Sequence, residues 1–367
     1  MKNLIFFYPT IYNDGLKKTF ELYTKYLKKN FKIIIITNTS NNKVLKSISP
    51  EVKVINVNNV FLSKIKFINE IICLTKAFKF FEENSIIFSL DKHFYLLMLK
   101  FLGFKFKLIL RIPNPIYNPF SLAETKFINK KIFTKNPGSV LGLLDLKFLK
   151  YSDKVIVYSK NHYRFLKKNY NLNNIEFIRN YFPKYNGKKK TKKKYNIFFV
   201  GRLVESKDPI FFLVNSLKLI KHINISIHII GDGILFKKLI KISKNFKRKV
   251  KFYGFVNDPF KKYNKRMDLL CLTSKYDGTP NVLGEAVSYK IPCLAPRGVG
   301  CVNEILNNGK FGNLYKPGNS LNFKNMLSTS IKNYQDAIEK SKKAYKNLEK
   351  YSEKNTLKKL SKLLENF

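Results

Sequence analysis

The sequence lacks the features that mark membrane-spanning, secreted or disulfide-stapled proteins. Lys interrupts every hydrophobic segment, so no run of 18 apolar residues occurs and no transmembrane helix is predicted. The N-terminal residues have no long apolar core before a small-residue cleavage site, and we expect a first β-strand there instead of a signal peptide. The few cysteines show no metal-ligand spacing, which predicts reduced, packed thiols in a cytosolic protein. They are Cys73, Cys271, Cys293 and Cys301.

Acidic residues and arginine are also scarce. The chain has 70 Lys and Arg against 24 Asp and Glu, a formal net charge of +46, yet only seven of the basic residues are Arg. Nucleic-acid-binding proteins more often cluster Arg within a recognisable module, and neither feature is found. Scattered Lys is typical of a biased composition, so we do not predict nucleic-acid binding. A basic surface would still favour an anionic membrane leaflet.

The chain does contain a repeated alternation of short apolar strands and amphipathic helices. With 367 residues, of which 45% are hydrophobic, two cores are expected. In the first half, alternation predicts a parallel sheet with helices on both faces. Helices are expected over Leu16–Lys29 and Phe94–Leu102. Strands are expected over Leu4–Tyr8, Lys32–Thr37, Val52–Val57, Ile86–Ser89, Lys107–Arg111, Asp153–Ser159 and Ile175–Asn180.

The boundary between the halves is predicted from a polar, charged run, Pro183–Lys194. We therefore expect a first Rossmann-like domain over residues 1–185 and a linker over 186–194. A second Rossmann-like domain should cover 195–345, and a C-terminal helix over 346–367 should return to the first domain. The segment Asn118–Gly142 has weak periodicity and is either a loop or a pair of short basic helices.

The second half opens with a pattern suited to a diphosphate. A strand, Asn196–Val200, runs into Gly201 and Arg202, and Lys207 stands at the start of a helix expected over Asp208–Lys221. This order places two cations and helix N–H groups at one strand end, where they can bind phosphate oxygens. The alternative is an ordinary surface Arg and Lys in a Lys-rich chain. Further strands are expected over Ser226–Ile230, before Gly231, and over Val250–Tyr253.

The most informative stretch follows, between Met267 and Glu304. A strand (Met267–Lys275) leads into the turn Asp277–Asn281, and a helix is expected over Val282–Tyr289. A second strand, Ile291–Ala295, then precedes a Gly-rich turn and the short helix that carries Glu304. Turn amides suit phosphate, and the carboxylates of Asp277 and Glu285, with seven residues between them, suit hydroxyl groups.

This stretch resembles the signature of retaining, nucleotide-sugar-dependent glycosyltransferases of the GT-B fold, and most closely glycosyltransferase family 4 (group 1). That family carries two glutamates with seven residues between them, whereas here Asp277 stands in the first place. The resemblance implies an α/β fold of the GT-B type, with two Rossmann-like domains whose parallel sheets face each other across a cleft. No Asp-x-Asp motif is present, so neither metal nor cofactor is expected.

The resemblance also implies roles for individual residues. Arg202 and Lys207 would neutralise the donor diphosphate, Glu285 would hold the ribose and Asp277 the donor sugar, and these four are the expected catalytic residues. Gly15 is the one glycine kept in a first loop that is Gly-rich in the family, although a glycine at a tight turn is more often structural than functional. His93 and Arg111, which follow strand ends, are candidates for the acceptor side. The expected donor-binding residues are Gly15, Gly201, Arg202, Lys207, Gly231, Phe255, Val256, Asp277, Gly278, Thr279, Pro280, Asn281, Val282 and Glu285.

The function predicted from these patterns is transfer of a hexose or N-acetylhexosamine from a nucleoside-diphosphate sugar, with UDP as the expected nucleotide. The acceptor is expected to be a glycan or lipid-linked glycan of envelope polysaccharide synthesis, reached from the cytoplasmic face of the inner membrane. Three alternatives remain open: a non-catalytic nucleotide-sugar-binding protein of the same fold, a transferase for a small soluble acceptor, and a charge-driven nucleic-acid binder. His162, His222 and His228 fall in predicted helices or strands and are expected to be structural.

Overall fold

A computed structural model describes residues 1–9, 15–38, 52–57, 66–81, 85–90, 93–112, 147–185 and 194–367. The chain divides into two compact units. The first comprises Met1–Tyr181 with Lys354–Phe367, and the second comprises Phe182–Glu353. These limits differ by a few residues from those suggested by the sequence, since residues 182–185 and 346–353 go with the second unit. The segment Asn118–Gly142 lies outside the described residues.

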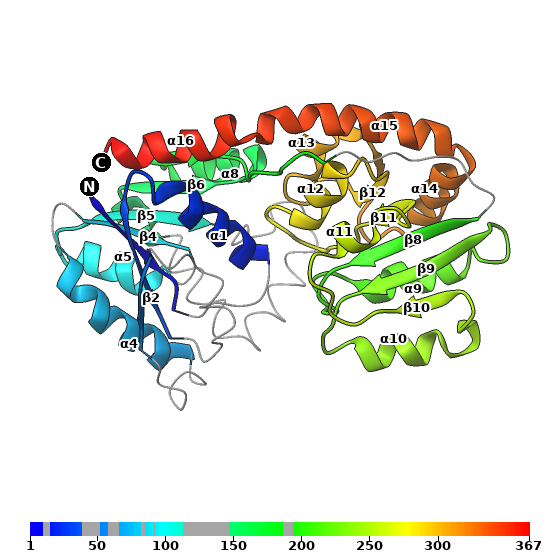
Figure 1. Ribbon diagram of the computed structural model, residues 1–367, viewed down its shortest axis with the longest axis horizontal. Coiled ribbons are helices and arrows are strands. Elements are labelled where there is room, and N and C mark those ends of the chain that lie inside the picture. The colour runs from blue at the N-terminus through cyan, green and yellow to red at the C-terminus, as the bar shows by residue number, and fades with distance from the viewer. Residues whose placement is uncertain are drawn as a thin grey trace. The chain divides into compact units, whose positions relative to one another are not determined.

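The first unit is built on a seven-stranded parallel sheet with the strand order β3-β2-β1-β4-β5-β6-β7 (Figure 1). Every strand predicted from the sequence in this half is present, with ends shifted by up to three residues. Helix α4 was not predicted. The strands are β1 (Asn3–Phe7), β2 (Lys32–Thr37), β3 (Lys53–Asn56), β4 (Ser85–Ser89), β5 (Lys107–Ile112), β6 (Lys154–Val157) and β7 (Ile175–Phe177). The described helices are α1 (Gly15–Leu27), α4 (Lys66–Ala77), α5 (Phe94–Phe101), α8 (Lys160–Tyr170) and α16 (Glu353–Glu365).

Alternate strand residues of the first unit enter two separate cores. Phe6 packs in the core shared with α1 and α16, and Phe7 packs in the core shared with α4, α5 and α8. Burial on both faces explains why these strands read as continuous apolar runs. The C-terminal helix α16 is fixed to this unit by Leu357 and by a hydrogen bond of 3.0 Å from Lys359 Nζ to the Phe177 carbonyl.

The second unit has a six-stranded parallel sheet with the order β10-β9-β8-β11-β12-β13. Successive strands run outward from β8 to β10 and, on the other side, from β11 to β13. The sheet therefore has a switch point between β8 and β11, and open α/β sheets bind ligands beyond the carboxyl ends of such strands. The strands are β8 (Tyr195–Val200), β9 (Ile225–Ile230), β10 (Val250–Phe252), β11 (Leu269–Cys271), β12 (Cys293–Pro296) and β13 (Asn313–Tyr315).

Helices cover both faces of this second sheet (Figure 1). The C-terminal helix expected over 346–367 begins only at Glu353, and two helices that are separated at Asn333 precede it. The helices are α9 (Pro209–Leu217), α10 (Phe236–Ile242), α11 (Pro259–Tyr263), α12 (Asn281–Ser288), α13 (Val302–Ile305), α14 (Ser320–Lys332) and α15 (Tyr334–Asn347).

The two ends of the second unit are joined to each other and to α12. The Phe182 amide donates a 3.1 Å hydrogen bond to the Tyr351 carbonyl, and the two rings lie 5.7 Å apart. A Cβ added to Gly284, within α12, would lie 2.4 Å from the Phe182 ring. Glycine is therefore required at this position because the ring occupies the space that a side chain would need.

The substitution Gly284→Ala is expected to destabilise the protein, although Ala is the better helix former by about 1 kcal/mol. Displacing the buried Phe182 ring should outweigh that gain, for a net loss of about 1–3 kcal/mol in chemical denaturation. Introducing Phe182→Leu into the Gly284→Ala variant should recover part of the loss. An increase in stability for Gly284→Ala alone would contradict this packing.

The buried cysteines and histidines lie within the packed interior of the fold. All four cysteines are free and buried, as predicted, and burial together with the charge of Glu70 raises the pKa of the Cys73 thiol to about 12. Burial lowers the pKa of His162 to about 4, and burial with nearby cations does the same for His228. His228 accepts or donates hydrogen bonds with Tyr253 and Asn196, so its ring is held within the fold.

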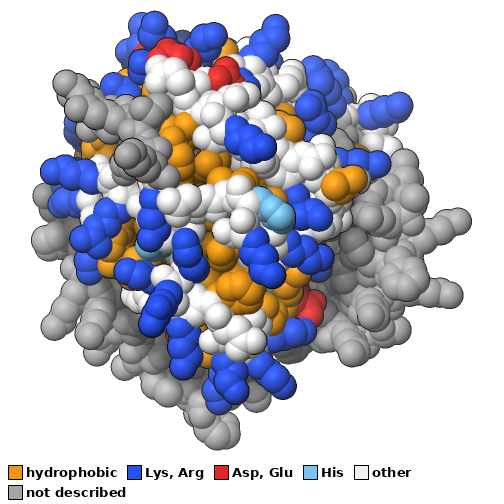
Figure 2. All heavy atoms as spheres, turned by 90° about the vertical axis from the view of Figure 1, so that its right-hand side faces the viewer, with side chains coloured by type: hydrophobic (Ala, Val, Ile, Leu, Met, Phe, Trp, Pro, Cys, Tyr) orange, Lys and Arg blue, Asp and Glu red, His pale blue; other side chains and the backbone are white. Residues whose placement is uncertain are grey.

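The basic residues are spread over the surface. Figure 2 shows Lys and Arg side chains over most of one face, with hydrophobic side chains between them and few acids. Their dispersal agrees with the scattered Lys of the sequence. Among the described residues, no helix is both long and apolar enough to cross a membrane.

Candidate functional site

Three glycine turns lie side by side where β8, β9 and β10 end. The Gly201 amide donates to the Ile230 carbonyl at 3.0 Å, and the Gly231 amide donates to the Gly254 carbonyl at 2.8 Å. Gly231 has φ +137°, and a Cβ on it would lie 1.9 Å from the Gly201 carbonyl oxygen. Only glycine permits this approach, so the two turns form one continuous backbone surface at the sheet edge.

The loop from Arg202 to Asp208 is fixed at both ends. Leu203 exchanges backbone hydrogen bonds with the turn after β9, donating to the Asp232 carbonyl at 2.8 Å and accepting from the Leu235 amide at 3.0 Å. At the other end, the Thr273 hydroxyl lies 3.0 Å from the carbonyl oxygens of Lys207 and Asp208. These contacts hold Lys207 over the end of β11, while the Arg202 side chain is exposed.

The best-defined contact in the site is an ion pair between Lys207 and Asp277, which are 70 residues apart in the sequence. Asp277 is 7% exposed and follows β11, whereas Lys207 comes from the loop after β8. The pair therefore spans the switch point of the sheet. Because burial of a carboxylate is costly without a partner, the ammonium group of Lys207 provides the counter-charge for Asp277.

A further glycine turn, at Gly300, packs against the turn that carries Asp277. Gly300 has φ +53°, and a Cβ on it would lie 2.3 Å from the Gly278 carbonyl oxygen. The Cys301 amide donates to the same oxygen at 3.1 Å. The backbone from Asp277 to Gly278 is thereby fixed by residues that follow β12.

Helix α12 begins at Asn281, directly after this turn, and carries Glu285 in its second turn, half-buried. The structure thus places Gly201, Lys207, Gly231, Asp277 and Gly278 within linked loops at one sheet edge. Thr279, Pro280, Asn281 and Val282 continue the same turn into the helix. Phe255, 60% exposed, and Val256, half-buried, follow β10 on the outer side of the sheet.

The remaining predicted residues belong to the first unit. Gly15 is the first residue of α1. His93 stands at the start of α5, is 5% exposed, and its Nδ1 lies 2.8 Å from the Ser89 hydroxyl oxygen. Arg111 is 2% exposed near the carboxyl end of β5.

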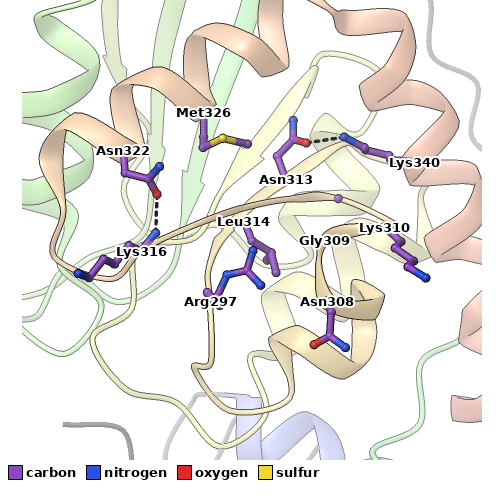
Figure 3. A pocket seen from close by; sticks show the side chains of 11 residues that line it. Arg297, Asn308, Gly309, Lys310, Asn313, Leu314, Lys316, Asn322, Met326 and Lys340 are labelled. Carbon is purple, nitrogen blue, oxygen red and sulfur yellow. Dashed lines mark hydrogen bonds between the residues drawn. The ribbon is translucent and has the colours of Figure 1, made fainter.

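The sequence did not predict a polar pocket that runs along the edge strand β13 of the second sheet (Figure 3). Its volume is about 460 Å³, and Arg297, Lys310, Lys316 and Lys340 contribute to its lining. Lys340 is paired with Asp336 at 2.8 Å and donates to Asn313 at 2.9 Å. The presence of Arg297 and Lys316 directly after strand ends was the signal that could have revealed this pocket.

Residues 182–354 match the model of a protein family described as glycosyl transferases group 1. The chain is similar over part of its length to lipopolysaccharide 1,6-galactosyltransferase. Identity to the Salmonella typhimurium protein is 35% over 97 residues, 25% of this chain and 27% of that protein. Identity to the Escherichia coli protein is 30% over 139 residues, 36% of this chain and 38% of that protein. The matches thus cover less than half the length of these relatives.

Solved structures resemble the chain over its whole length. TarM of S. aureus superposes with a TM-score of 0.79 at 15% identity, covering 99% of this chain and 98% of the other. HepE of Anabaena, in complex with UDP and glucose, superposes with a TM-score of 0.75 at 15% identity, with both chains fully covered. The chain therefore has the GT-B fold predicted from its sequence, and its second unit matches the glycosyl transferases group 1.

Proposed function

We propose that the protein is a glycosyltransferase that takes its sugar from a nucleoside-diphosphate sugar. The observation that carries this proposal is the Lys207–Asp277 pair, which sets a cation and a carboxylate beside the glycine turns at the switch point of the second sheet. Lys207 and the exposed Arg202 supply positive charge for a diphosphate, and the turn amides supply further donors. Asp277 and Glu285 are acceptors for the hydroxyl groups of a sugar and a ribose.

The identity of the donor is proposed from relatives. HepE is described in complex with UDP and glucose, and two partial relatives are named galactosyltransferases, which favours a UDP-hexose donor. The word lipopolysaccharide in the names of those relatives also favours an envelope glycan as acceptor. We further propose that the protein reaches this acceptor by peripheral contact with the cytoplasmic membrane face. The basic surface is suited to such contact with anionic lipid.

In the proposed reaction, the bond between the anomeric carbon and the diphosphate breaks while the acceptor oxygen bonds to the same carbon, with retention of configuration. Lys207, Arg202 and the turn amides stabilise the charge that develops on the departing diphosphate. The leaving phosphate accepts the proton of the acceptor hydroxyl, so no enzyme nucleophile is required. Asp277 has a shorter side chain than the Glu usual in the family, and its pairing with Lys207 fixes how far it reaches.

The proposal is tested by the thermal stability of the purified protein with UDP, GDP, ADP and CMP at moderate salt. A ligand at 100 times its Kd stabilises the folded state by about 2.7 kcal/mol, which is readily measured. We expect stabilisation by UDP and a loss of this effect in Glu285→Ala. Absence of stabilisation by any nucleotide would contradict the proposal. Binding of UDP without turnover of any UDP-sugar would instead favour a non-catalytic binding protein of the same fold.

A further inference from the structure

The first unit buries the positive charge of Arg111. Arg111 is 2% exposed, and its Nε and Nη1 atoms have no hydrogen-bond partner. Within the part of the chain that the structure describes, no carboxylate forms an ion pair with it. Burying a guanidinium is costly unless an anion compensates it. The residues that the structure describes therefore leave this charge without a compensating carboxylate.

The surroundings of Arg111 hold the guanidinium in place without neutralising it. Its central carbon lies 4.4 Å from the ring centre of Tyr158 and 5.9 Å from that of Tyr23. The two tyrosine hydroxyls are 3.0 Å apart. Burial acts to lower the pKa of Arg111, but the charge interactions and hydrogen bonds with Tyr158 and Tyr23 raise it, so the side chain stays charged. Aromatic faces orient a guanidinium and leave N–H groups to bind another partner.

The position of Arg111 in the sheet is one where ligands bind. Arg111 is the fifth residue of β5, close to its carboxyl end, and alternation places it on the same face as Ile109. Tyr158 follows β6, the next strand in the sheet, and Tyr23 comes from α1, which covers this face. Parallel α/β sheets bind ligands beyond the carboxyl ends of their strands. The polar groups of these three side chains thus lie together near the carboxyl ends of β5 and β6, next to the apolar core.

It is informative in this chain that residue 111 is Arg and not Lys. Of 70 basic residues only seven are Arg, so the composition strongly favours Lys wherever a positive charge alone is needed. A planar guanidinium differs from an ammonium group in its fork of donors, which matches the oxygens of phosphate and carboxylate groups. An Arg at a buried, unpaired position indicates that this geometry is used.

We propose that Arg111, held between Tyr23 and Tyr158, binds an oxyanion, namely a phosphoryl or carboxylate group carried by the acceptor. The binding of the oxyanion follows from the first unit alone. Its assignment to the acceptor rests on the proposed glycosyltransferase function. The proposal makes the acceptor an anionic molecule and Arg111 the residue that selects it over a neutral one.

The test uses the full chain with inorganic phosphate and D-glucuronate as probes, at constant ionic strength in chloride. Thermal shifts are measured with UDP present, so that phosphate does not bind the donor site. We expect at least one probe to stabilise the wild type, with affinity weakened tenfold or more in Arg111→Met and partly retained in Arg111→Lys. The exposed Arg164 of α8 provides a matched control, and Arg164→Met should bind the probe like the wild type. Equal affinity in Arg111→Met, or no binding of either probe, would overturn the proposal.

A second measurement separates a ligand-binding role from a structural one. Without anion, Arg111→Met should unfold at the same or a higher denaturant concentration than the wild type, because it replaces an uncompensated charge with an apolar side chain. If Arg111 served only to join the tyrosines, the midpoint would fall and probe binding would not depend on it.

Failure of the two proposals can be told apart. If UDP raises the thermal stability but neither phosphate nor D-glucuronate does, the donor-site proposal is supported and the oxyanion-site proposal is contradicted. The opposite outcome is that no nucleotide stabilises the protein, while a probe stabilises it in a way that depends on Arg111 and persists in Lys207→Met. That result would support the oxyanion site and contradict the glycosyltransferase function.

Discussion

Replacing Lys207 with Met is expected to lower kcat/KM for sugar transfer by about 100- to 1,000-fold. Removing one preorganised charge or hydrogen-bond donor that stabilises the transition state typically lowers the rate by a factor of this size. The ammonium group of Lys207 is within the ion pair with Asp277, and its loss removes both the cation and the support of that carboxylate. Steady-state kinetics with a UDP-sugar would measure the effect.

The same substitution affects folding, and a double variant separates the two consequences. Lys207→Met leaves the buried Asp277 carboxylate unpaired, which should cost about 1–3 kcal/mol in chemical denaturation. Adding Asp277→Asn should recover part of this stability without restoring transfer. The exposed Lys238 of α10 offers a control, and Lys238→Met should change neither property. Full activity in Lys207→Met would show that the diphosphate is bound elsewhere.

Replacing Gly231 with Ala is expected to have the second largest effect. The new Cβ would lie 1.9 Å from the Gly201 carbonyl oxygen, so one of the two turns must move. Because backbone meets backbone, no side-chain rotation can relieve the contact, and we expect a loss of roughly 2–4 kcal/mol in stability. Binding of UDP should weaken in parallel, since the same turns form the surface beside Lys207.

Gly254→Ala is the matched comparison for that prediction, because Gly254 follows the neighbouring strand with φ +63° but has no atom within 4 Å of an added Cβ. Its cost should be limited to the backbone conformation, about 1 kcal/mol. Equal stabilities of Gly231→Ala and Gly254→Ala would show that the close approach of the two turns is unimportant.

Much of the fold was predictable because its signals are local. Strand periodicity and apolar runs identified every strand of both sheets except β13. By contrast, the break between α14 and α15 at Asn333 depends on no Gly or Pro, and a continuous amphipathic pattern runs through it. Helix α4 was overlooked although its sequence, KFINEIICLTKA, has clear helical spacing.

The contacts within the candidate site were not predictable from the sequence. Strand ends in the sequence placed Lys207 and Asp277 at one sheet edge, yet their pairing depends on the strand order β8-β11, which local patterns do not encode. The requirement for glycine at position 284 was equally unpredictable, because it comes from contact with the Phe182 ring, some hundred residues earlier in the sequence. Long-range packing of this kind has no signal in a single sequence.

The hydrogen bond between Phe182 and Tyr351 has a consequence for how such chains can diversify. The second unit is an insertion within the first, and its entry and exit lie next to each other. A module with adjacent ends can be exchanged for another without changing the scaffold that receives it. Recombination at these two points would therefore replace the second unit while leaving the first unchanged. Under the proposed function, such an exchange would alter the donor preference and keep the acceptor.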